Sequence, residues 1–243
     1  MARGDFLYGL EAEAEPQRTL VSLSGSESGS GAEVWLEVET AKAFLEMQAA
    51  AEQDGIALAI CSGYRSFERQ LAIWNAKASG KRTLLDKDSL PVDDIGALSD
   101  DEDELVALIL LWSALPGASR HHWGTDLDLF DSAQISKHEL KLVNAEYEPL
   151  GPCYKLDLWL DERALDFGFY RPFQAGLSGV SPERWHLSFL PKAKGFLEQF
   201  DSERLRQILD HSDVTLKQGL LRRLSELVET YVRHVAPYPV GFK

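Results

Sequence analysis

The chain has 243 residues, enough for one large domain with a sizeable core. Hydrophobic residues make up 44% of it, including six Trp and eleven Phe, which predicts a packed globule rather than a disordered chain. The net charge of -14 argues against sequence-independent binding to nucleic acid or to an anionic membrane, since both require a basic face.

Apolar runs of the length that exported or membrane-spanning segments need are missing from the sequence. The opening stretch MARGDFLYGLEAEAEPQ lacks a signal-peptide core, and no window approaches the roughly 18 apolar residues that span a bilayer. We therefore expect a cytoplasmic protein as the sequence is written, or a periplasmic or secreted one if an export signal has been removed. Cys61 and Cys153 are too few for a disulfide framework, and the apolar run before Cys61 predicts a buried free thiol.

The first half of the chain alternates between helix and strand signals. Residues 22–31, SLSGSESGSG, predict a flexible loop. Thr40 is a candidate N-cap for a helix that ends at Gly55, and the apolar run IALAIC that follows predicts a short buried strand. Ser66 is the candidate cap of a second helix, FERQLAIWNAKASG.

The second half begins with a polar, acidic stretch, residues 80–104, which we interpret as a surface excursion. Ser99 and Glu102 form a candidate capping box for the apolar helix LVALILLWSAL, which Pro116-Gly117 would end. The segments TDLDLF and RWHLSF alternate as half-buried strands do, and the pattern is helical from Pro191 onward.

This order predicts an α+β fold with a small antiparallel sheet packed with helices. We expect an N-terminal segment and loop (1–32), a main domain (33–200) and a C-terminal helical extension (201–243) packed on the same domain. The amphipathic pattern of the last helix fits packing on its own domain or on a second copy, so it leaves the oligomeric state open.

One stretch collects side chains of the kind that bind metal ions. In SRHHWGTDLDLFD, His121 and Asp128 are seven residues apart, and Gly124 lets the chain fold back between them. The distant segment SPERWHLSF adds His186, with Glu183 three residues earlier. Spacing alone leaves a metal site and an ordinary Asp-rich turn equally open.

Three blocks resemble one known family. SRHHWGTDLD and ERWH resemble the Ser-x-His-x-x-Gly-x-Ala-x-Asp and Glu-x-Trp-His signatures of the zinc D-alanyl-D-alanine carboxypeptidases of the VanY type, relatives of the VanX dipeptidases. SGYRSFERQ resembles a third block of that family, and the blocks follow the family's order. The resemblance implies a Hedgehog/DD-peptidase-like fold and one zinc ion per chain.

The resemblance also implies roles for particular residues. His121, Asp128 and His186 would bind zinc, Glu183 would be the general base, and Arg65 would stabilise an oxyanion or hold a substrate carboxylate. For Arg65 a surface salt bridge is the alternative, and for Ser119 a loop hydroxyl bonded to backbone. The expected substrate-binding residues are Ser119, Asp126 and Tyr64.

Asp126 stands where the family signature has Ala. It could orient a ligand histidine, bind a substrate ammonium group, or turn to solvent. His122 is expected in a loop or pocket wall, and the aromatic residues Trp123 and Trp185 are expected mainly to pack the metal loops. We interpret Asp131, His138 and residues 100–104 as solvated surface or helix-start charges.

The expected function is that of a zinc-dependent metallopeptidase, similar to D-alanyl-D-alanine carboxypeptidases, that hydrolyses peptidoglycan-type peptides. The alternatives are an L,D-carboxypeptidase, a dipeptidase or an endopeptidase on related cell-wall peptides, or a zinc-binding recognition module without catalysis. The partner expected is a peptidoglycan-derived peptide, with no nucleic acid and no membrane span.

Overall fold

A computed structural model describes residues 4–10, 18–92 and 101–239 of the chain. Its centre is a four-stranded antiparallel sheet with the strand order β3-β6-β8-β7. The strands are β3 (Leu58–Ser62), β6 (Asp126–Asp131), β8 (His186–Phe189) and β7 (Phe169–Tyr170). The α+β architecture with a small antiparallel sheet is thereby confirmed.

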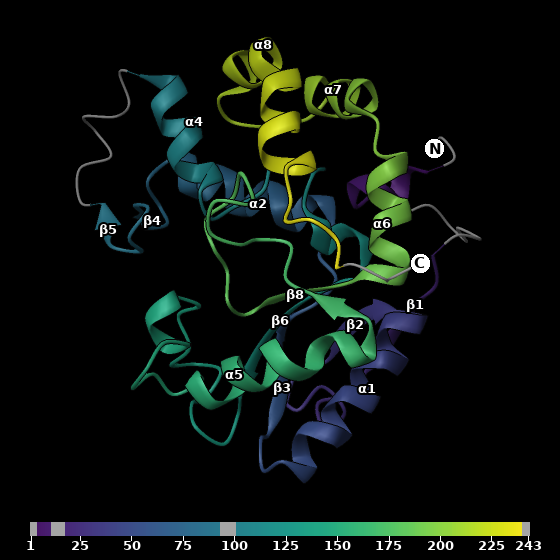
Figure 1. The fold of residues 1–243 in the computed structure, drawn as a ribbon. Helices are drawn as coiled ribbons and strands as arrows, with labels where there is room; N and C mark the ends of the chain where they lie inside the picture. The colour runs from purple at the N-terminus through teal and green to yellow at the C-terminus, as the bar shows by residue number, and fades with distance from the viewer. Residues whose placement is uncertain (1–3, 11–17, 93–100, 240–243) are drawn as a thin grey trace.

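The helices fall into two groups on opposite sides of this sheet (Figure 1). The first group is α1 (Val38–Gln53) and α5 (Tyr154–Arg163), which lie below the sheet in the figure. The second group consists of α2 (Phe67–Ala78), α4 (Glu102–Leu110), α6 (Leu190–Gln199), α7 (Ser202–Asp210) and α8 (Lys217–Val228). A π-helical turn, Glu229–Arg233, continues α8.

Shorter elements connect these parts. Two antiparallel hairpins are β1 (Leu20–Leu23) with β2 (Val34–Glu37), and β4 (Leu84–Leu85) with β5 (Pro91–Val92). The 3-10 turns are η1 (Asp5–Tyr8), η2 (Arg120–Trp123), η3 (Asn144–Glu146) and η4 (Ala164–Phe167). No helix in the described ranges is long and apolar enough to span a bilayer.

Strand β6 is buried along its whole length, not half-buried as its alternation predicts. Leu127 and Leu129 pack into the hydrophobic cluster that also contains side chains of α1 and α5. Because side chains alternate along a strand, Asp126 and Asp128 face the opposite way, toward the second helix group. That group excludes solvent from them, so the polar face of the sheet is an interior surface.

Carboxylates cap two helices at positions other than those predicted. Glu37 caps α1 by accepting hydrogen bonds from the N–H groups of Glu39 and Thr40, so Thr40 lies inside the helix. Asp101 caps α4, while the predicted cap Ser99 lies outside the described residues. Ser66 caps α2 as predicted, and α4 ends at Leu110, ahead of the Pro-Gly pair.

The Ser/Gly-rich loop is tied to the sheet at its centre, which its composition did not indicate. Ser28 is buried, its carbonyl accepts a hydrogen bond from the Ile60 N–H at 2.8 Å, and its hydroxyl donates to the Ala32 carbonyl at 2.6 Å. The loop joins β1 to β2, a hairpin that the sequence patterns did not predict.

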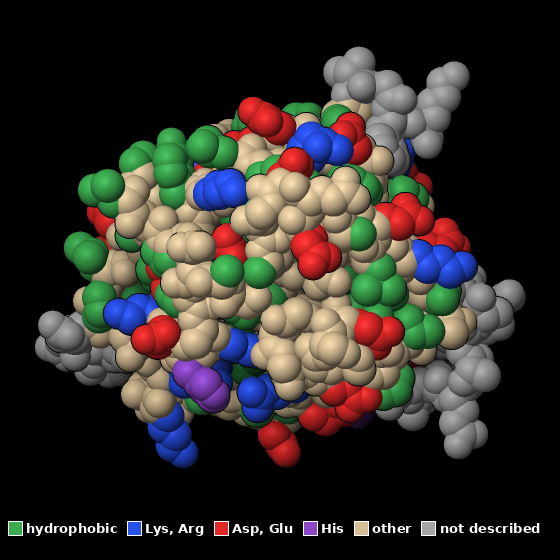
Figure 2. All heavy atoms as spheres, turned by 90° about the horizontal axis from the view of Figure 1, so that it is seen from below, with side chains coloured by type: hydrophobic (Ala, Val, Ile, Leu, Met, Phe, Trp, Pro, Cys, Tyr) green, Lys and Arg blue, Asp and Glu red, His purple; other side chains and the backbone are tan. Residues whose placement is uncertain are grey.

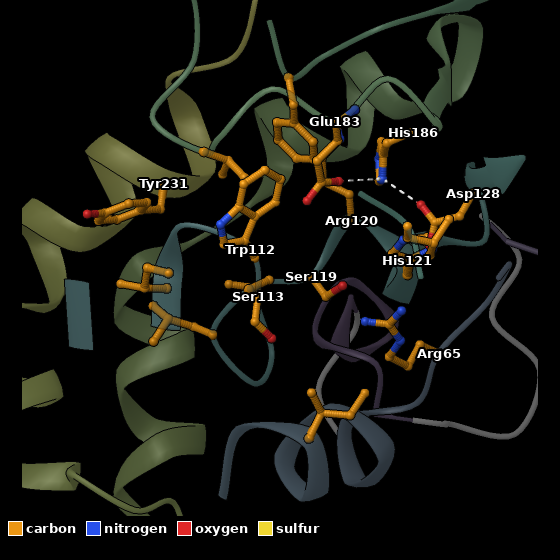
Figure 3. A pocket seen from close by; sticks show the side chains of 18 of the residues that line it. Arg65, Trp112, Ser113, Ser119, Arg120, His121, Asp128, Glu183, His186 and Tyr231 are labelled. Carbon is orange, nitrogen blue, oxygen red and sulfur yellow. Dashed lines mark hydrogen bonds and ion pairs between the residues drawn. The ribbon is translucent and has the colours of Figure 1, made fainter. Parts of the chain in front are cut away.

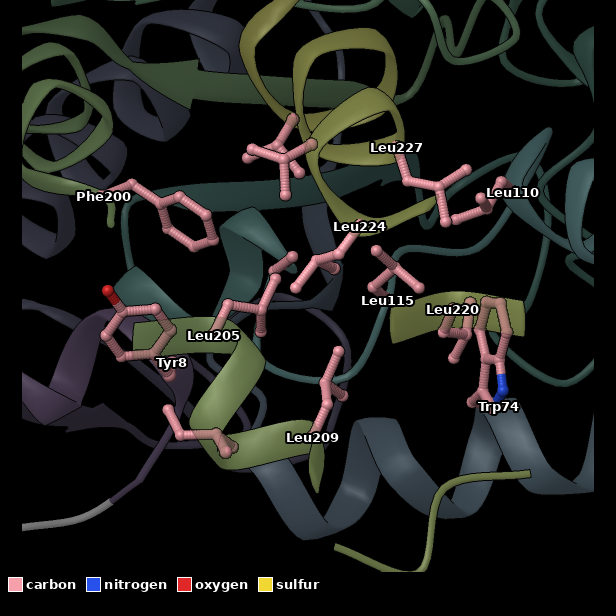
Figure 4. Packing of buried hydrophobic residues seen from close by; sticks show 14 of the residues in the cluster. Tyr8, Trp74, Leu110, Leu115, Phe200, Leu205, Leu209, Leu220, Leu224 and Leu227 are labelled. Atoms are coloured by element: carbon pink, nitrogen blue, oxygen red, sulfur yellow. The ribbon is translucent and has the colours of Figure 1, made fainter. Parts of the chain in front are cut away.

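The C-terminal helices share one hydrophobic cluster with α2 and α4 (Figure 4). Leu205 of α7 and Leu224 of α8 are buried in it, together with Trp74 of α2. Tyr8 of η1 is buried in the same cluster. Residues beyond position 200 therefore bury their apolar faces against the helices that flank the site.

Candidate metal centre

Side chains of His121, Asp128 and His186 converge on the buried polar face of the sheet (Figure 3). Their potential ligand atoms all lie within 4.8 Å of one another. Asp128 and His186 are cross-strand partners in the β6–β8 register, so strand pairing brings them together. His121 comes from η2, and Gly124, at a φ of 74°, turns the chain from η2 into β6.

Both histidines have one ring nitrogen anchored by a protein acceptor. In His121, Nδ1 lies 2.9 Å from the Gly63 carbonyl oxygen, and Nε2 lies 3.3 Å from Asp128 Oδ2. In His186, Nε2 lies 3.0 Å from Asp126 Oδ1, and Nδ1 lies 3.2 Å from Asp128 Oδ1. An outer acceptor on one nitrogen fixes the tautomer and aims the other nitrogen at the centre of the cluster.

The cluster has the electrostatics of a cation site. Burial opposes protonation of His186, yet its hydrogen bonds to Asp126 and Asp128 raise its pKa to about 10. Burial alone would raise the pKa of Asp128, but the two histidines hold it below the usual range. Positive charge is thus favoured between these groups. Two imidazole nitrogens and a carboxylate are donors that zinc prefers, so the residues present fit a zinc ion.

Asp126 lies behind the cluster and outside the cavity lining. Its Oδ1 accepts hydrogen bonds from Arg120 Nε at 2.8 Å and from His186 Nε2 at 3.0 Å, while Thr125 donates to Oδ2. The Asp126 side chain is 0% exposed, so of the three alternatives for this residue the one in which it turns to solvent is wrong. These contacts also leave no support for direct substrate binding; they favour a role in orienting His186.

A cavity of about 320 Å³ opens beside the cluster. Glu183 lines it with a side chain that is 12% exposed, and Glu183 Oε2 lies 3.4 Å from His186 Nδ1. Burial raises the pKa of Glu183 to about 7, although His186 opposes the shift. A carboxylate at this edge can take up and release a proton near neutral pH.

Arg65 and Ser119 line the cavity across from Glu183 (Figure 3). The Arg65 guanidinium donates to Gln70 Oε1 at 2.8 Å and to Ser62 Oγ at 3.1 Å, which fixes its orientation and leaves other N–H groups for a ligand. No carboxylate of residues 4–10, 18–92 or 101–239 forms an ion pair with Arg65, in contrast to the alternative of a surface salt bridge. Within the described part of the chain no group hydrogen-bonds the Ser119 hydroxyl, in contrast to the alternative of a backbone-bonded loop hydroxyl.

Two further predicted residues lie elsewhere. Tyr64 is outside the cavity lining. The Cζ atom of Arg18 lies 4.9 Å from the centroid of the Tyr64 ring, so this placement gives no support to substrate contact. His122 is fully buried, also outside the lining. Its Nδ1 lies 2.6 Å from the Arg65 carbonyl oxygen and its Nε2 accepts from the Gly117 N–H, so His122 supports the backbone of the site.

The remaining assignments have mixed outcomes. Trp123 packs against Phe196, whereas Trp185 lines the cavity and stacks on Trp112 at 6.1 Å between ring centroids. The assignment of Asp131 to the surface is wrong, because it is buried and accepts hydrogen bonds from backbone N–H groups. His138 is exposed, and both cysteines are free thiols, Cys153 buried and Cys61 partly buried.

Sequence reasoning missed several residues that line the cavity. Lys77, Arg82 and Trp112 lie on its helical side, although Arg82 belongs to the stretch interpreted as a surface excursion. A usable signal was the helical spacing after Arg65, because Ile73 and Lys77 are four residues apart and share one face of α2.

An α+β protein in which two histidines and an aspartate converge beside a cavity-lining glutamate has the constitution of a mononuclear zinc hydrolase. The sequence model described as VanY, D-alanyl-D-alanine carboxypeptidase, matches residues 33–192. The chain belongs to this family.

Individual proteins and solved structures are also similar to this chain. A Haemophilus influenzae protein described as uncharacterized is 34% identical over 121 residues, which cover 49% of this chain and 92% of that protein. The solved structure of VanYB in complex with D-alanine-D-alanine superposes with a TM-score of 0.52 at 20% identity, covering 84% of this chain and 94% of that one. A second VanY structure, a D,D-pentapeptidase variant in complex with Zn(II), gives a TM-score of 0.50 at 21% identity and covers 84% and 89%. At these identities the likeness to the solved structures concerns the fold.

Proposed function

We propose that this protein is a zinc-dependent D,D-carboxypeptidase that removes the terminal D-alanine from peptidoglycan-type peptides. The observation that carries the proposal is the placement of Glu183 at the edge of the His121, Asp128 and His186 cluster, inside a cavity. Membership of the VanY family supports the reaction, and the solved relatives that hold D-alanine-D-alanine or Zn(II) support the substrate and the metal.

The three ligand residues would hold zinc through His121 Nε2, the Asp128 carboxylate and His186 Nδ1. Bound there, zinc acts as a Lewis acid on a carbonyl group and makes water a nucleophile at neutral pH. Asp126 accepts the hydrogen bond of His186 Nε2, so the imidazole stays aligned while substrate enters and product leaves.

Glu183 moves the proton in this reaction. Its carboxylate accepts a proton from the attacking water and donates it to the amine nitrogen of the departing D-alanine. A pKa raised to about 7 by burial suits both steps, because the group can hold or release the proton at neutral pH.

Arg65 and Ser119 bind the oxygen atoms of the substrate around the scissile bond. The N–H groups of Arg65 that Gln70 and Ser62 leave free face negative charge on the carbonyl oxygen and on the adjoining terminal carboxylate. The Ser119 hydroxyl adds a neutral donor on the same side.

The test compares wild-type protein with Glu183→Gln, measuring zinc content and D-alanine release from a D-Ala-D-Ala-terminated pentapeptide. We expect one zinc per chain in both proteins and a loss of turnover of about 10²- to 10⁴-fold in the variant. Undiminished hydrolysis by pure Glu183→Gln would refute the mechanism. Zinc without release in wild type would point to another peptide bond or to a recognition module without catalysis.

A further inference from the structure

The cavity has a second charged region at the end of α2. Lys77, in the last turn of α2, and Arg82, in the turn that leads to β4, both line the cavity. Lys77 lines the same cavity as Arg65 and Glu183, as expected for a long side chain that leans from the last turn of α2 toward the N-terminal end of the helix. The Lys77 amine interacts electrostatically with Glu183, Arg82 and Arg65.

Lys77 and Arg82 differ from Arg65 and Arg120 of the same cavity in lacking side-chain partners among the described residues. Arg65 donates to Gln70 and Ser62, and Arg120 forms an ion pair with Asp126. Across the described ranges, by contrast, the side chains of Lys77 and Arg82 form neither an ion pair nor a hydrogen bond. Burial lowers the pKa of Lys77 to about 8 although Glu183 opposes the shift, so a further anion beside the amine would stabilise its charged form.

The charge of the whole chain makes this arrangement informative. The net charge is -14, and the face shown in Figure 2 intersperses acidic with basic side chains. Lys77 and Arg82 lie in the cavity wall near the candidate zinc ligands and have no ion-pair partner among the described residues. Their positive charge would attract an anionic group of a ligand.

We propose that Lys77 and Arg82 form a subsite for a second carboxylate of the substrate, carried by the side chain of a residue on the amino side of the scissile bond. The inference rests on the proposed carboxypeptidase function. Because Arg65 and Ser119 bind the oxygens next to the scissile bond, the terminal carboxylate is already accounted for. A second carboxylate on the same peptide must come from a residue further from its C-terminus. The substrate class is thus an acidic peptide rather than one with a lysine at that residue.

The experiment uses the zinc-loaded full chain and three peptides, acetyl-L-Glu-D-Ala-D-Ala, acetyl-L-Gln-D-Ala-D-Ala and acetyl-L-Lys-D-Ala-D-Ala. Glu and Gln have nearly the same shape, so the ratio of their kcat/KM values isolates the charge. We expect wild type to prefer the Glu peptide over the Gln peptide roughly fivefold to tenfold, as one partly exposed charge-assisted contact would give. The Lys peptide should be the poorest, and 1 M salt should reduce the preference.

Two variants assign the preference to the subsite. Lys77→Met keeps an unbranched stem and removes the charge, and Arg82→Gln changes an exposed side chain that has no ion pair or side-chain hydrogen bond among the described residues. In both, the Glu-to-Gln ratio should fall toward one. Lys81→Met is the matched control, since Lys81 is exposed, adjacent to Arg82 and outside the cavity lining, and it should keep the wild-type ratio.

Outcomes separate this subsite from the reaction itself. Equal cleavage of the Glu and Gln peptides by wild type, or an unchanged ratio in both variants, would overturn the subsite and leave the carboxypeptidase function intact. Failure of zinc-loaded wild type to cleave any of the three peptides would overturn the proposed function, and the subsite with it.

Discussion

The sheet side and the α2 side of the cavity differ in whether their charged side chains have partners within the protein. On the sheet side, charged groups have protein partners: Arg120 pairs with Asp126, which also accepts from His186, and Arg120 donates to Ser188. On the α2 side, Lys77 has no such partner among the described residues. On the sheet side the Arg120 Nε and Nη2 groups have protein partners before any ligand binds, while Arg120 Nη1 is buried without one among the described residues. On the α2 side the unpaired cations are available to an anion.

This difference has an energetic basis. Burying the Arg120 and Asp126 charges is tolerable only because each satisfies the other and because Ser188, Thr125 and His186 share the network. Arg82 is exposed and Lys77 is partly buried, so solvent can still reach the charges of the α2 wall.

The largest effect should come from removing a ligand on the sheet side. His186→Ala takes away one donor of the cluster and should lose both bound zinc and turnover, the latter by at least about 10³-fold, since metal-dependent activity goes with the ion. Metal analysis and D-alanine release measure the two losses. The exposed His138→Ala serves as the control and should resemble wild type. A full complement of zinc in His186→Ala would contradict the assignment.

A smaller effect on zinc binding is expected from changing Asp126, which supports the ligand His186 from outside the cavity. Asp126→Ala removes the acceptor of His186 Nε2 and should weaken zinc binding about 10- to 100-fold, measured by competition with a chelator. It also leaves Arg120 buried and unpaired, so urea unfolding of the metal-free protein should show a loss of about 3–5 kcal/mol.

The double variant Asp126→Ala/Arg120→Met separates these two consequences. Removing the stranded charge should restore much of the stability, while zinc binding should stay weak because the acceptor of His186 is still missing. Recovery of zinc affinity together with stability would show that Asp126 acts through folding alone.

The smallest effect concerns the α2 wall and pH. The pKa of Lys77, lowered to about 8 by burial, means that its amine is charged below that pH and neutral above it. The Glu-to-Gln ratio of kcat/KM, which reports the free enzyme, should therefore decline as pH rises from about 7 to 9. In Lys77→Met the ratio should vary little over this range, and a wild-type ratio that rises with pH would contradict the role of Lys77.

Sequence patterns were most informative where a short segment determines its own local structure. The blocks SRHHWGTDLD and ERWH specify a turn and two strands, and the structure brings their predicted zinc ligands together as cross-strand and loop neighbours. The strands β3, β6 and β8 and helix α2 follow from local periodicity for the same reason.

Local sequence patterns could not predict which residues are buried by elements distant in the chain. Asp126, Asp131 and the whole of β6 are enclosed by segments far along the chain, so a polar alternation that usually faces solvent faces an interior. The environment of Lys77 likewise depends on residues around position 183, which no local pattern relates to α2. Tyr64 shows the converse, because its place in a family block did not reveal that its ring contacts Arg18.

The contacts that support the loop around His121 also limit the order in which parts of the chain can fold. Trp123 donates its indole N–H to the Leu7 carbonyl, Tyr8 donates to the Asp201 carbonyl, and Arg204 pairs with Asp5 across 199 positions of sequence. Such long-range contacts form slowly, because a long stretch of chain must be closed before they are made. During synthesis the ribosome must reach α7 before the Asp201 and Arg204 contacts to η1 can form, although the Trp123 contact is available earlier. The support under a proposed zinc ligand is therefore finished only when more than four-fifths of the chain has been made.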